Sequence, residues 1–127
     1  MKTQERKVTS IEEIKARTAE AVVELPGFGD GEPFVARLRR IGLLEMAQAG
    51  SIPNELLGAV SELYTKGTGG ITGIKDNARV LDYYASRALV EPSYQELTEA
   101  GVALTDRQLL AIYYYGIGGV EGLKPFR

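Results

Sequence analysis

The chain has 127 residues, of which 44% are apolar and 25% charged, and this balance is typical of one soluble globular domain. It contains neither cysteine nor histidine, which excludes thiolate and imidazole nucleophiles, zinc fingers and histidine-rich metal sites. Fifteen Lys and Arg against seventeen Asp and Glu give a net charge of -2, so no basic excess attracts nucleic acid over long range.

The N-terminal residues are charged and no apolar run follows them, so we expect no secretory signal and a cytoplasmic protein. The longest apolar runs are far shorter than the ~20 residues that cross a bilayer, so no membrane contact is expected. We expect residues 1–127 to form a single domain, with residues 1–9 flexible.

The first predicted elements are a helix and a β-hairpin. Ser10 and Glu13 have the spacing of a capping box, which predicts a helix that begins at Ile11. Residues 21–25 are rich in β-branched side chains, and residues 34–40 alternate between apolar and polar side chains. Turn residues lie between these runs, and we expect Asp30-Gly31 to supply the positive φ angles of the turn.

Helical patterns follow from residue 43. A short helix is expected to end before Gly50, and another is expected to begin at Pro53. The glycine-rich residues 67–73 predict a loop. The longest helix follows it and is expected to end before Pro92, with an apolar stripe formed by Ile74, Ala78, Leu81, Ala85 and Ala88.

Two further capping boxes, Ser93 with Glu96 and Thr105 with Gln108, predict two more helices. If the last helix continues through its glycines, one face contains Leu109, Ile112, Tyr113, Gly116, Ile117, Val120 and Leu123. Together the patterns predict an α+β fold, mostly α-helical, with one β-hairpin near the N-terminus.

Catalytic and cofactor sites are not indicated. Residues 67–73 precede a predicted helix, as a phosphate-binding loop would, but their spacing matches neither nucleotide-binding pattern, and a connector is favoured. Residues 70–73 match the G-x-x-G of an RNA-binding clamp without the basic surroundings that such a clamp needs. Helix capping explains most of the paired acidic residues. We therefore expect no catalysis, no cofactor and no metal.

The arginines at 37, 39 and 40 are the one local concentration of positive charge in the middle of the chain. Because they alternate with apolar residues, they are expected on the outer face of a strand. Solvated side chains are the simpler interpretation of Arg37, Arg39 and Arg40, and contact with an acidic partner surface is the alternative.

Consecutive tyrosines are the other candidate for binding. Tyr83-Tyr84 and residues 113–115 lie on two predicted helices, and a helix cannot turn three consecutive side chains to one core. If Tyr113 packs inward, at least one of its neighbours should be exposed, and exposed tyrosines suit protein contacts. Tyr83, Tyr84, Tyr114 and Tyr115 are therefore candidate partner-binding residues. Packing within the monomer is the competing interpretation.

Several stretches resemble a known family. These are ELPGFGDGEPFVARLRR at residues 24–40, LEMAQAGSIPNELL at 44–57, ALVEPSY at 88–94, LTDRQL at 104–109 and GLKPFR at 122–127. Together they resemble the small tail assembly chaperones of long-tailed bacteriophages and prophages, over roughly residues 20–127.

The resemblance implies a non-enzymatic role. Such chaperones bind the long, helical tape measure protein in the host cytoplasm, keep it soluble, help to bring tail tube subunits to it and leave the finished tail. In this family a longer product is often made by ribosomal frameshifting. A helical client is commonly held in a groove by anchors at i, i+3 and i+4, and the four tyrosines could line such a groove. A homo-oligomer is compatible with this role.

Two other functions remain open at this point. One is a structural phage protein, such as a head-tail connector or a tail terminator, that stays in the virion. The other is a small nucleic-acid-binding module that uses Arg37, Arg39 and Arg40, which the charge balance disfavours.

Overall fold

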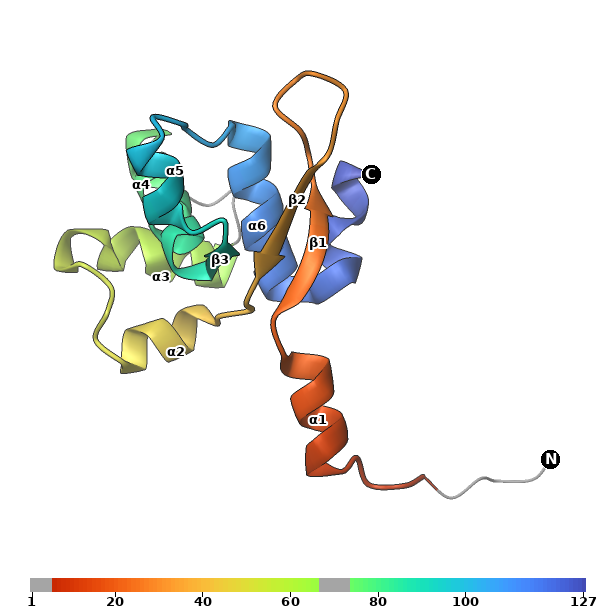
Figure 1. Cartoon of the computed structure of the whole chain (residues 1–127). Coiled ribbons are helices and arrows are strands. Elements are labelled where there is room, and N and C mark those ends of the chain that lie inside the picture. The colour runs from red at the N-terminus through yellow and green to blue at the C-terminus, as the bar shows by residue number, and fades with distance from the viewer. Residues whose placement is uncertain (1–5, 67–73) are drawn as a thin grey trace.

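Three antiparallel strands and the helices around them make up the computed structural model, which describes residues 6–66 and 74–127 (Figure 1). The elements are α1 (Ile11–Thr18), β1 (Ala21–Leu25), β2 (Phe34–Leu38), α2 (Leu43–Gln48), η1 (Asn54–Leu56), α3 (Leu57–Lys66), α4 (Ile74–Ala88), β3 (Leu89–Glu91), α5 (Tyr94–Glu99), α6 (Asp106–Gly118) and η3 (Gly119–Phe126). The predicted fold class, α+β and mostly α-helical, is confirmed.

The predicted hairpin is formed by β1 and β2. Its register runs from Ala21 opposite Leu38 to Leu25 opposite Phe34. Alternate side chains of both strands point into the core, as the period of two requires, and these are Val23, Leu25, Ala36 and Leu38.

The hairpin turn differs in one detail from the prediction. Gly31 has the expected positive φ of 85°, but the second positive φ, 93°, belongs to Gly29 and not to Asp30. The Asp30 carboxylate instead accepts a 3.2 Å hydrogen bond from the Glu32 backbone N–H. Asp30 therefore stabilises the turn through its side chain.

A third strand, β3, was not predicted. It extends the sheet in the order β1-β2-β3 and pairs antiparallel with β2, with Leu38 opposite Leu89 and Arg37 opposite Glu91. Three residues are too few to show an alternating pattern. This strand depends on a neighbour that lies about fifty positions earlier in the chain, so local sequence does not reveal it.

The predicted apolar stripe of α4 is largely confirmed, because Leu81, Ala85 and Ala88 are buried. Ala78 is exposed, Val80 and Tyr84 are buried as well, and the side chain of Ile74 lies outside the described part of the structure. The prediction left out Tyr84, whose ring is apolar enough to lie in the core.

All three predicted capping boxes are present, at Ser10, Ser93 and Thr105. The last helix does break at its glycines: α6 ends at Gly118, and Gly119 has a φ of 63°. From this turn η3 packs back against α6. Because the chain reverses, the single face that an unbroken helix would have had is not formed, and Ile117 and Val120 are exposed.

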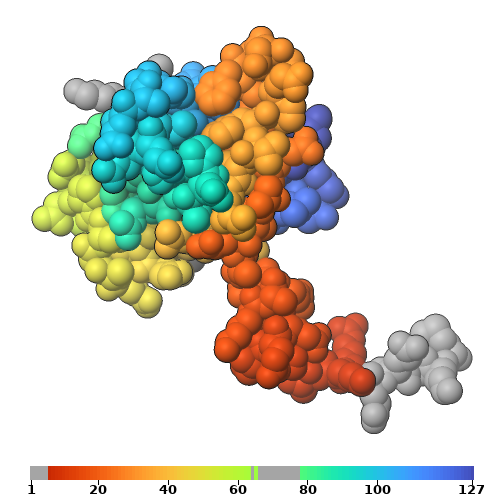
Figure 2. Space-filling model, viewed as in Figure 1, coloured from red at the N-terminus to blue at the C-terminus, as the bar shows by residue number. Residues whose placement is uncertain are grey.

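One apolar cluster contains buried residues from the hairpin, β3, α2, η1, α3, α4, α6 and η3. In contrast, α1 has no buried residue and projects from the rest of the protein (Figures 1 and 2). Residues 6–9 are exposed and belong to no helix or strand. Residues 1–5, and the loop predicted at 67–73, lie outside the described residues.

Candidate protein-binding groove

Tyr84 from α4 and Tyr113 from α6 hold the C-terminal half of α6 against the core. Their rings meet edge to face with centroids 5.3 Å apart, a favourable aromatic geometry. The Tyr84 hydroxyl donates a 2.5 Å hydrogen bond to the Ile41 carbonyl oxygen. Gly116 permits this approach, because an added Cβ would overlap the Tyr84 hydroxyl.

Burial favours the neutral form of both tyrosines. Loss of solvation raises the pKa of Tyr84 to about 12, and the pKa of Tyr113 also rises to about 12, with Tyr114 adding a smaller effect. Tyr113 is 3% exposed, and its hydroxyl forms no hydrogen bond within the described part of the chain. It can therefore bond to a molecule that enters the space beside it.

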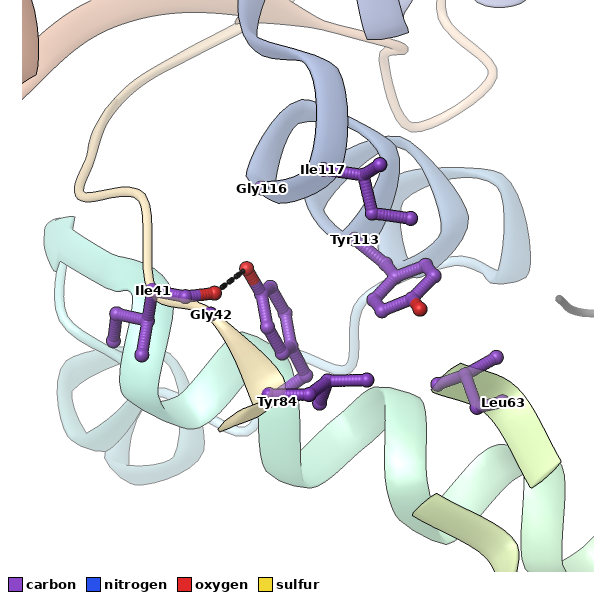
Figure 3. A pocket seen from close by; sticks show the side chains of 8 residues that line it. Ile41, Gly42, Leu63, Tyr84, Tyr113, Gly116 and Ile117 are labelled. Atoms are coloured by element: carbon purple, nitrogen blue, oxygen red, sulfur yellow. Dashed lines mark hydrogen bonds between the residues drawn. The ribbon is translucent and has the colours of Figure 1, made fainter. Parts of the chain in front are cut away.

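The first hollow of this region opens beside the two tyrosines and has a volume of about 370 Å³. Figure 3 shows the Tyr84 hydroxyl pointing to Ile41, with the Tyr113 ring beside that of Tyr84 and Ile117 above them. The full lining consists of Ile41, Gly42, Leu43, Leu63, Tyr84, Tyr113, Gly116 and Ile117. Every side chain in this set is apolar or aromatic.

A second hollow of about 370 Å³ shares Tyr113 and Ile117 with the first. Its other lining residues are Tyr114, Gly118, Glu121, Gly122 and Pro125. The two hollows are thus neighbours at the C-terminal end of α6, and we call them together the α6 groove. Ile117 is 62% exposed in the wall between the two hollows, so its apolar side chain is open to contact from outside.

The Arg40 side chain caps the C-terminal end of α6 next to this groove. Its Nη2 donates a 3.0 Å hydrogen bond to the Ile117 carbonyl oxygen, and the guanidinium also contacts the Gly116 carbonyl at 3.4 Å. These carbonyls have no partner within the helix, and they lie at the negative end of its dipole. Arg40 therefore stabilises the helix end that carries Ile117.

The candidate tyrosines occupy different environments. Tyr83 is half-buried and its hydroxyl donates to the Ser51 carbonyl, and Tyr114 is half-buried with its ring 5.5 Å from that of Phe126. Tyr84 and Tyr115 are 2% and 5% exposed, so for these two the competing interpretation, packing within the monomer, describes the structure. Among the four candidates, only Tyr84 and Tyr114 line the α6 groove.

No tyrosine of the run 113–115 is fully exposed, contrary to prediction. The helix geometry that motivated the prediction is unchanged, but η3 folds back and covers the side of α6 that would otherwise face solvent. Phe126 of η3 packs against Tyr114, while Tyr113 and Tyr115 face the core.

The three arginines are separated in the structure. Arg37 forms a 3.4 Å ion pair with Glu91, and Arg40 bonds to the end of α6. Arg39 is exposed, and its backbone N–H donates to the Ala88 carbonyl. Because two of the three guanidiniums already have protein partners, they do not form one basic surface for phosphates.

The α6 groove includes residues that sequence reasoning did not select as binding residues. Ile41, Leu43 and Leu63 come from distant parts of the chain, and Ile117 was predicted only to share one face of the last helix if that helix continued through its glycines. The one local signal is that Ile117 lies between Gly116 and Gly118, glycines at which the helix was expected to break.

The described residues include no group of three or more acidic side chains that could hold a metal ion. None of the helices in residues 6–66 and 74–127 combines the length and apolar character that spanning a bilayer requires. The lining of the α6 groove is mostly apolar, and its chemistry suits the binding of an apolar surface.

Comparisons with protein-family models, with curated proteins and with solved structures found no match.

Proposed function

We propose that this protein is a phage tail assembly chaperone, which binds the tape measure protein in the host cytoplasm and assists assembly of the tail tube without catalysis. Two things support the proposal. One is the sequence resemblance over residues 20–127. The other is the α6 groove, whose lining suits an apolar segment of a client protein.

The observation that carries the proposal is the pair of apolar hollows on either side of Ile117. An amphipathic helix binds such a surface by placing side chains at i and i+3 or i+4 into successive hollows. The Tyr113 hydroxyl, which has no partner in the described part of the chain, supplies one polar contact for orientation. A tape measure protein rich in amphipathic helices offers this kind of segment.

The test is binding of the tape measure protein to Ile117→Lys, measured by calorimetry or pull-down. This change places a charge in the groove, and a cation is compatible with the C-terminal end of a helix. We expect affinity to fall at least about tenfold, as for loss of a central anchor. Val102→Lys is the matched control, because Val102 is also exposed (40%) but lies outside the groove lining.

Equal affinity of folded Ile117→Lys and the unchanged protein would remove the α6 groove from the proposed function. Mass spectrometry of purified virions tests the role itself, since a chaperone should be absent from them. Detection of the chain in virions would instead favour a connector or a tail terminator.

A further inference from the structure

The N-terminal helix α1 is well formed but buries none of its residues against the described part of the chain. Its capping box is complete, and it has eight residues, none of them buried. It projects from the body of the protein (Figures 1 and 2). Isolated helices shorter than ~12–15 residues are marginal in water, because packing supplies most of the stability of helices in proteins. A surface outside this chain is therefore the natural source of that packing.

One face of α1 has the chemistry of a docking helix. At 100° per residue, Ile11, Ile14 and Thr18 lie within ~60° of one another around the helix. Ile11 is 63% exposed and Ile14 is 43% exposed, so the stripe is open to solvent. Lys15 and Arg17 border the stripe on its two sides, whereas the acidic side chains of the first turn lie toward the opposite face. The exposed face is thus apolar with cationic edges.

The α6 groove has the complementary pattern. Its hollows are apolar, and one acidic side chain, Glu121, lines the second of them. Glu121 also pairs with Lys124, but both side chains are more than 70% exposed, so this pair is weak and easily exchanged. Arg40, the nearby cation, is engaged by the α6 carbonyls.

We propose that α1 of one copy of this chain lies in the α6 groove of a second copy, with Ile11 and Ile14 in the two hollows. Ile11 and Ile14 have the i, i+3 spacing that neighbouring hollows require. Each copy carries both the helix and the groove, so two copies can exchange helices reciprocally and form a closed, symmetric dimer. The proposal does not depend on the chaperone function. It adds that an incoming client helix competes with α1 for the groove.

Single-cysteine variants test the contact directly, because the chain has no cysteine of its own. Purified Ile14→Cys and Ile117→Cys are mixed in equal amounts and oxidised mildly. We expect disulfide-linked heterodimers to exceed either homodimer at least about tenfold, since only the mixed pair brings the two thiols together. Ile14→Cys mixed with Val102→Cys is the control, and it should show no such preference.

The oligomeric state provides the second measurement. Light scattering of the full chain should show a dimer that dissociates on dilution, and Ile11→Ser combined with Ile14→Ser should be monomeric at all concentrations while remaining folded. A wild-type monomer at every concentration would overturn the proposal, as would random cross-linking. An intramolecular disulfide in the Ile14→Cys, Ile117→Cys double variant would also overturn it, since α1 would then occupy its own groove.

The outcomes separate the two proposals. If Ile117→Lys loses the client but remains a dimer, the chaperone function stands and the helix exchange is wrong. If Ile117→Lys becomes a monomer with unchanged client affinity, the exchange stands and the client binds elsewhere.

Discussion

Helices α1 and α6 begin in the same way and differ in everything that follows. Ser10 with Glu13, and Thr105 with Gln108, form complete capping boxes. Five residues of α6 are buried, and η3 covers the side that the core leaves open, whereas α1 buries none. A capping box therefore determines where a helix begins, while packing determines how strongly it is held. Changes that disrupt the packing of α6 should destabilise the protein, whereas changes in α1 should act mainly on its association.

The largest expected effect is a loss of stability at alkaline pH, which acts on the two tyrosines that hold α6 against the core. Tyr84 and Tyr113 have pKa values raised from 10 to about 12 by burial, so the folded state retains protons that the unfolded state loses above pH 10. The stabilisation is fully present below pH 10 and is lost as the pH rises toward 12. We expect the free energy of unfolding to fall by on the order of a few kcal/mol in this window.

Urea unfolding between pH 8 and 12 measures this loss, and Tyr113→Phe is the matched variant. Removal of a buried hydroxyl that has no partner within the described residues should raise stability at pH 8 by about 1 kcal/mol. The free energy of unfolding of this variant should also depend less on pH above pH 10. A slope identical to that of the unchanged protein would show that Tyr113 ionises as freely in the folded state as in the unfolded one.

The next largest loss of stability is expected for Gly116→Ala. The added methyl group overlaps the Tyr84 hydroxyl, which must move away from the Ile41 carbonyl. We expect a loss of about 2–4 kcal/mol in chemical unfolding, since overpacking and a broken buried hydrogen bond add together. Gly118→Ala is the control, because a Cβ there meets nothing within 4 Å. Equal stability of the two variants would contradict the packing described for Tyr84.

Matched substitutions in the capping boxes of α6 and α1 compare the packed helix with the exposed one. Gln108 is fully buried, and its Nε2 donates a 2.9 Å hydrogen bond to the Pro26 carbonyl, which ties α6 to the end of β1. Gln108→Ala should cost about 1–2 kcal/mol, because the Pro26 carbonyl loses its donor. Glu13→Ala, at the same position in the exposed capping box of α1, should cost about 0.5 kcal/mol or less. Similar losses in urea unfolding would show that packing does not distinguish the two helices.

The smallest effect on stability is expected for substitutions in α1. Ile11→Ser combined with Ile14→Ser removes two apolar side chains from a helix with no buried residue. In dilute protein we expect the free energy of unfolding to change by less than about 0.5 kcal/mol. Thermal unfolding at low concentration checks this. A large loss would mean that α1 packs against its own chain.

Much of the fold could be predicted because its signals are local. The capping residues, Gly50 and the alternation in residues 34–38 each act over one turn or one strand, and the structure confirms the elements that they predict. The short strand β3 and the burial of Tyr115 depend on segments distant in the chain, β2 and the core around α6. Local patterns contain no information about such pairings.

The candidate site was harder to predict for the same reason. The tyrosine run indicated the correct helix, and Tyr84 and Tyr114 do line the α6 groove. The groove itself exists because α6 breaks at Gly119 and η3 folds back, which leaves Ile117 exposed. The reversal of the chain depends on one positive φ angle whose consequence is tertiary.

Hydrogen exchange of the α1 amides at low and at high protein concentration is the most direct test of whether α1 gains its packing from a second molecule. We expect these amides to exchange rapidly in dilute protein and to become protected at high concentration, together with residues around Ile117, while the buried α6 amides stay protected throughout. Protection of α1 that is the same at both concentrations would contradict helix exchange between copies.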